Sequence, residues 1–126
     1  MFGRRSLVLA MFAANLYPLP GLADSDAEMG RRIAEQHCSR CHVVGDFNPM
    51  GGIGSTPSFQ LIVNALEDWE ARFLTFHQRV PHPPFVRIAG FPAPDPKVNP
   101  PNAAPFELEL EDIVRIAAFA RTLKDD

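Results

Sequence analysis

The alternation of apolar and polar residues predicts helices over much of the chain beyond residue 26. Between Ala27 and Cys38, apolar residues recur at helical spacing and charged residues occupy the other face, with Asp26 as a candidate N-cap. Gly30 is costly inside this helix, which predicts that another backbone approaches closely there. A strong helical period over Glu109–Leu123, with acidic residues in its first turn, predicts a C-terminal helix.

Two shorter helices are expected between these. Thr56-Pro57 is typical of a helix start, a hydroxyl followed by a proline, and a mostly apolar run follows it to residue 66. A third helix is expected over residues 67–78, where aromatic residues recur at helical spacing. Residues 43–56 have no usable period and predict an irregular loop.

The segment from Pro81 to Pro105 holds nine of the chain's 13 prolines. Proline lacks a backbone N–H donor, so this segment predicts a long extended loop, of the kind that is usually functional or mobile. No strand signal is convincing anywhere in the sequence. The predicted fold class is therefore all-α, in one small domain.

The first 23 residues have the pattern of a cleaved secretory signal peptide. Arg4 and Arg5 precede an uncharged apolar run over residues 6–16, and Gly21-Leu22-Ala23 suits a signal peptidase. We therefore expect residues 1–23 to be removed, leaving residues 24–126 as a periplasmic domain. The apolar run is short for a bilayer span, so no stable membrane insertion is expected, although a retained anchor is the competing interpretation.

The charge balance argues against nucleic acid as a partner. The chain carries 12 Lys and Arg against 15 Asp and Glu, and signal cleavage would remove Arg4 and Arg5 from the basic side. Binding to phosphates needs clustered basic residues, which the sequence lacks.

The sharpest chemical signal is Cys38-Ser39-Arg40-Cys41-His42. Two thiols spaced in this way can each add to one vinyl group of a porphyrin, and the histidine that follows is then delivered to the iron. A thioredoxin-like redox pair would need a surrounding βαβ pattern, and a zinc site would need more than His77 and His82, since no second cysteine pair exists. A plain disulfide would not require the histidine. We therefore predict one haem c per chain, covalently attached.

With these segments, the sequence resembles the class I (monohaem) bacterial cytochromes c. The resemblance runs from Gly30 to Leu123 and is carried, besides the cysteine motif, by Thr56-Pro57-Ser58-Phe59, Pro81-His82-Pro83-Pro84 and the last helix from Glu111-Asp112-Ile113 onward. It implies a small all-α fold of the cytochrome c type, with three to four helices around one haem c.

The resemblance also implies two specific contacts. Gly30 on the first helix would face the aromatic ring of Phe119 on the last one. The backbone carbonyl near Pro57 would accept the Nδ1 proton of His42, which would fix the ring and increase its basicity toward the iron.

The second axial ligand is where the sequence departs from the family. The family usually supplies a methionine directly after the prolines, but Phe85 stands there and no methionine follows Met50, which lies too near the proximal side to reach the other face. His82 is the first candidate for a distal ligand, His77 is the alternative, and an open or water-bound site with Phe85 above it is the third possibility. His37 is expected to be an ordinary solvated helix residue.

The leading functional hypothesis is one-electron transfer between periplasmic redox proteins, with the redox chemistry residing in the iron and no catalytic residues. Two alternatives remain open. The absent methionine also suits a haem-based sensor of small ligands or a weak peroxidase, and the proline-rich loop suits a haem subunit of a dehydrogenase or oxidase complex.

Overall fold

The computed structural model describes residues 22–97 and 100–125. Its elements, in chain order, are α1 (Leu22–His37), α2 (Phe59–Ala65), α3 (Trp69–Thr75), a 3-10 turn η1 (Phe76–Gln78), β1 (Val86–Ile88), β2 (Phe106–Leu108) and α4 (Leu110–Arg121). The predicted signal peptide, residues 1–23, lies outside the described residues except for the first two residues of α1. Within the described ranges, no helix is both long and apolar enough to cross a membrane.

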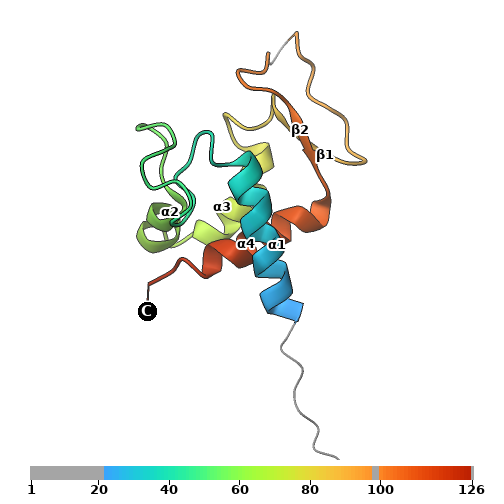
Figure 1. Cartoon of the computed structure of the whole chain (residues 1–126). Coiled ribbons are helices and arrows are strands. Elements are labelled where there is room, and N and C mark those ends of the chain that lie inside the picture. Colours follow the sequence, from blue (N-terminus) through green and yellow to red (C-terminus); the bar gives the residue numbers. More distant parts are fainter. Residues whose placement is uncertain (1–21, 98–99, 126) are drawn as a thin grey trace, which may run out of the picture.

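The scaffold is built on the crossing of α1 over α4 (Figure 1). At the crossing point a Cβ atom on Gly30 would collide with the backbone carbonyl of Arg115, so only glycine allows the two helices to come this close. The predicted close approach of a second backbone at Gly30 is therefore confirmed. The nearest atoms belong to Arg115 and Ile116, whereas the ring of Phe119 packs beside Phe59, with ring centroids 6.3 Å apart.

Helix starts differ from the sequence expectations in two places. Asp26 lies inside α1 and does not cap it, and its carboxylate faces the guanidinium of Arg115 at 3.7 Å. Helix α2 is capped by Ser58, whose Oγ accepts a hydrogen bond from the backbone N–H of Leu61 at 3.0 Å, so it begins after Thr56-Pro57.

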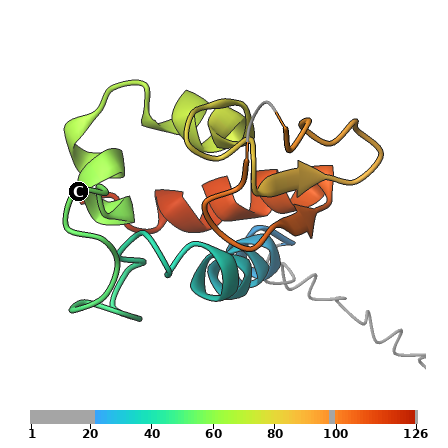
Figure 2. The ribbon, with the colours of Figure 1, turned by 90° about the horizontal axis from the view of Figure 1, so that it is seen from above.

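The core lies between α4 and the elements packed on it. Apolar side chains from every α-helix and both strands are buried there, and they form one cluster: Ala34, Val44, Phe59, Val63, Trp69, Phe73, Val86, Ile88, Leu108, Ile113, Ile116, Ala117, Phe119 and Ala120. The strands lie toward the N-terminal end of α4, and α2 lies toward its C-terminal end (Figure 2).

The predicted all-α class is wrong, and with it the expected cytochrome c-like fold of three to four helices. β1 and β2 pair in parallel, with Val86 opposite Phe106 and Ile88 opposite Leu108, so the described chain is a small mixed α/β domain. Each strand has three residues, too few for a period of two to be recognised, and a proline shortly precedes each strand. The loop expected over 81–105 therefore contains a strand.

Candidate functional site

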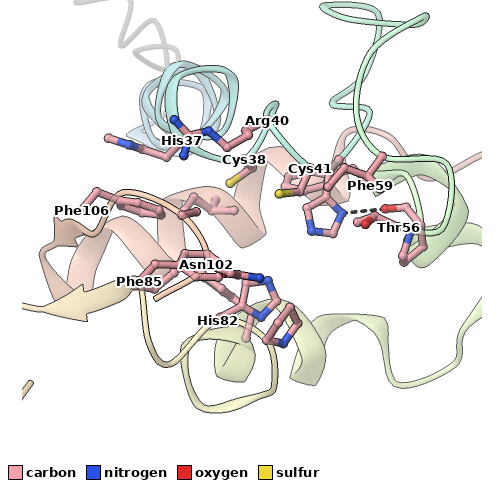
Figure 3. A pocket seen from close by; sticks show the side chains of 18 of the residues that line it. His37, Cys38, Arg40, Cys41, Thr56, Phe59, His82, Phe85, Asn102 and Phe106 are labelled. Atoms are coloured by element: carbon pink, nitrogen blue, oxygen red, sulfur yellow. Dashed lines mark hydrogen bonds between the residues drawn. The ribbon is translucent and has the colours of Figure 1, made fainter. Parts of the chain in front are cut away.

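A cavity of about 560 Å³ lies between the C-terminal end of α1, the loop before α2, helix α3 and the segment around β1 and β2 (Figure 3). Its walls are mostly apolar and aromatic. Its lining residues include all of the predicted site residues except the alternative ligand His77: Cys38, Cys41, His42, Pro57, His82 and Phe85.

Both cysteines face this cavity because α1 ends in a tight turn. The backbone N–H groups of Cys41 and His42 both donate to the carbonyl of Cys38, at 3.1 and 2.9 Å. This turn brings the two sulfur atoms to the same side of the chain (Figure 3). Desolvation raises the pKa of the Cys38 thiol to about 12, opposite to the lowered pKa of a redox-active thiolate. A thioredoxin-like role is therefore disfavoured.

His42 is held in one orientation by the loop that precedes α2. Its Nδ1 donates to the backbone carbonyl of Pro57 at 2.6 Å, and its ring meets the edge of Phe59 at a centroid distance of 5.5 Å. The predicted contact between His42 and Pro57 is confirmed. Because Nδ1 is engaged, Nε2 is the nitrogen left to bind a metal, and desolvation lowers the pKa of His42, which favours the neutral ligand form.

His82 lies opposite His42 in the same cavity. The two ring planes are within 6° of parallel and their centroids are 6.2 Å apart. The Nδ1 of His82 donates to the backbone carbonyl of Arg79 at 3.0 Å, so His82 also keeps Nε2 for a metal. Desolvation lowers its pKa as well.

The alternative candidate, His77, lies elsewhere. His77 lies in η1 and lines a second cavity of about 290 Å³, together with Phe91 and Leu110. Met50 is 97% exposed and is not among the residues that line the larger cavity. The structure therefore brings His82, and neither His77 nor Met50, to the cysteine motif.

The charged side chains around the larger cavity are basic, although the chain as a whole is acidic. Among the described residues that line it, Arg40 and Arg72 carry charge and none is a carboxylate. The Nε of Arg72 donates a hydrogen bond to the carboxylate of Asp68 at 2.8 Å. The two terminal nitrogens of Arg72 bond to no other side chain among the described residues. A flat apolar group with two carboxylates and a metal centre fits this lining, and haem, with its two propionates, is such a group.

A zinc site fits less well. A structural zinc ion needs four protein ligands, and no cluster of three or more His, Cys, Asp and Glu side chains converges within the described ranges.

Sequence reasoning missed an aromatic pair at the edge of the cavity. His37, expected to be solvated, stacks flat on Phe106, with ring centroids 4.4 Å apart and planes within 11°. The ring of Phe85 lies near the ring of Phe106, with ring centroids 6.5 Å apart. An aromatic residue directly after Pro105 was the one signal in the sequence that could have indicated this wall.

Asn48 was also missed, and it holds the cysteine motif in place. Its Oδ1 accepts from the backbone N–H of Val44 at 2.8 Å, and its Nδ2 donates to the carbonyls of Ser39 and His42 at 3.0 and 2.9 Å. One side chain thus ties the turn between the cysteines to the loop that follows His42. An asparagine in a loop of this composition gives no sequence signal for such a role.

Replacing Asn48 with alanine should lower the free energy of unfolding by about 2–3 kcal/mol, because three partly buried backbone groups lose their partner. Chemical denaturation of the purified protein measures this. Asn64→Ala is the matched control, since Asn64 makes two solvent-exposed hydrogen bonds to the backbone of Leu123 and Asp125, and its loss should cost less than about 1 kcal/mol. Equal effects of the two substitutions would contradict the role given to Asn48.

Comparison of the chain with protein-family models, with curated proteins and with solved structures returned no match in any of the three. The functional conclusion therefore depends on the geometry and chemistry of the site itself.

Proposed function

We propose that the protein is a c-type haem protein that transfers single electrons in the periplasm. The observation that carries this proposal is the convergence of Cys38, Cys41 and His42 on one cavity, with His42 oriented by the carbonyl of Pro57. Each cysteine S–H bond would add across one vinyl double bond of the porphyrin, which forms a thioether and releases no leaving group. His42 would bind the iron through Nε2.

Once bound, haem supplies a metal that cycles between Fe(II) and Fe(III), so the protein needs no acid–base residue for the redox step. The chain's own residues orient the group and shield it. Phe59, Phe73 and Ile116 line the cavity with apolar surface that excludes water. Arg40 and Arg72 are the side chains that can pair with the propionates.

The proposed partners are periplasmic redox proteins, or the other subunits of a redox complex. Export is supported by the signal-like sequence of residues 1–23. Encounters of this kind use small interfaces, and exposed side chains such as Arg40, Ile53 and Pro57 lie at the mouth of the cavity.

The test is to produce the full chain in cells that contain the haem-attachment machinery. The purified protein should keep its haem stain after denaturing electrophoresis, and spectroelectrochemistry should give a reversible titration with the slope of a one-electron couple. Loss of the stain on denaturation would overturn covalent attachment. A retained stain with no reversible one-electron couple would overturn electron transfer and leave the attachment standing.

A further inference from the structure

We propose that His82 is the second axial ligand of the haem iron, on the face opposite His42, and that it closes this iron to external small ligands. The assignment builds on the proposed haem attachment and specifies what that attachment leaves open, namely the second face of the iron. It starts from the placement of two imidazole rings across one cavity.

The distance between the two rings suits a shared metal ion. Two imidazoles that bind one metal from opposite sides, each through a bond of about 2 Å, have ring centroids about 6 Å apart. The centroids of His42 and His82 are 6.2 Å apart, with the planes within 6° of parallel. The directly stacked pair His37 and Phe106 is much closer, at 4.4 Å. The wider gap leaves room for a flat group between His42 and His82.

The hydrogen bonds of the two rings point to the same role. In each, Nδ1 donates to a backbone carbonyl: Pro57 for His42, at 2.6 Å, and Arg79 for His82, at 3.0 Å. A histidine that binds a metal through Nε2 almost always donates its other N–H in this way, because the bond fixes the ring and increases its basicity. His82 therefore has its Nδ1 engaged and its Nε2 left for a metal, as a ligand of this kind needs.

The backbone and the packing around His82 also hold it in place. Its N–H donates to the carbonyl of Arg79 at 2.9 Å, and its own carbonyl accepts from the N–H groups of Phe85 and Val86, at 3.0 and 2.9 Å. The ring meets the edge of Phe76 at 5.3 Å and lies 6.0 Å from the ring of Phe85. Phe85, which stands where the family places its methionine, thus forms a wall beside the ligand.

The other candidate side chains are engaged elsewhere. His77 lines the second cavity, where its Nε2 lies 3.0 Å from the side-chain amide of Gln78. Met50 is exposed, and the ring of His37 is covered on one face by Phe106.

Two imidazole ligands have a definite consequence for function. They make the iron low-spin and leave no open position for carbon monoxide, and they give a lower reduction potential than a histidine and methionine pair. Such a centre can exchange electrons, but it cannot bind a small ligand or peroxide without losing His82. The geometry thus favours the electron carrier over the sensor and the peroxidase.

The experiment uses the full-length haem-loaded protein and three variants, His82→Ala, His82→Met and His77→Ala. Absorption spectra are recorded before and after reduction, with and without carbon monoxide. The unmodified protein and His77→Ala should be low-spin and unchanged by carbon monoxide over minutes. His82→Ala should be high-spin and bind carbon monoxide at once, and added imidazole should restore its low-spin spectrum.

His82→Met keeps the iron six-coordinate and should raise the reduction potential, which decides the question even if His82→Ala retains no haem. The assignment is overturned if the unmodified protein binds carbon monoxide rapidly, or if His82→Ala keeps a low-spin spectrum, or if His82→Met leaves the potential unchanged. A haem stain that survives denaturation in these samples would still uphold the proposed attachment, so the two proposals fail separately.

Discussion

Replacing both Cys38 and Cys41 with alanine should abolish covalent haem attachment completely, so that no haem stain remains after denaturing electrophoresis. Each sulfur atom can supply one thioether bond, and both line the same cavity. A single substitution should leave one bond, so each single variant should keep a weaker stain. The stain relative to total protein measures the effect.

One substitution in the same turn serves as the control for the cysteine variants. Ser39→Ala removes a hydroxyl that donates to the carbonyl of Glu35 at 2.6 Å, and Ser39 neither carries a thiol nor lines the larger cavity. This control should stain like the unmodified protein. A double cysteine variant that stains at full strength would rule out thioether attachment at these positions.

Replacing Gly30 with valine should destabilise the fold by about 3 kcal/mol or more, because the new side chain has no space. Its Cβ would collide with the backbone carbonyl of Arg115, and a backbone group cannot change its rotamer to make room as a flexible side chain can. Helices α1 and α4 would have to separate, which would expose Ala34 and Ile116, both almost fully buried. Denaturant unfolding of the purified protein measures the loss.

Gly54→Ala is the matched control for Gly30→Val. Among the described residues, no atom outside its immediate chain neighbours lies within 4 Å of a Cβ placed on Gly54, so its substitution should change the free energy of unfolding by less than about 1 kcal/mol in either direction. If Gly30→Val were as stable as Gly54→Ala, the close crossing of the two helices could not be what holds the scaffold together.

The helices were the most predictable part of the fold. The stripe of apolar residues that predicted the last helix corresponds to Ile113, Ile116 and Ala120, all buried in α4. The costly glycine in the first helix correctly indicated a close backbone. These features are local, because the apolar residues that indicate a helix recur at a fixed spacing within one continuous stretch of chain.

The strands and the supporting contacts were not predictable in the same way. Strand β1 is paired with residues about 20 positions away, and its three residues alone carry no pattern that reveals this partner. Asn48 and the pair His37 and Phe106 act through contacts that only the folded chain creates. The motif Cys38–His42 was visible because its spacing is itself what the proposed cofactor requires.

The pairing of β1 with β2 also bears on how this protein could be altered. The strands are parallel, so Ile88 at the end of β1 lies opposite Leu108, whereas Phe106 at the start of β2 lies opposite Val86. The connection between Ile88 and Phe106 therefore has to return along the length of the pair.

Within this connection, Asn102 and Ala103 line the larger cavity and have to be kept, whereas Asp95, Pro96 and Lys97 are exposed. A peptide inserted among these exposed residues should have little effect on the rest, since doubling a loop costs only about 0.6 kcal/mol of closure entropy. His82 precedes β1 and Glu109 follows β2, so both stay in place. The exposed residues 95–97 are therefore an attachment point for a tag or an electrode linker outside the lining of the larger cavity.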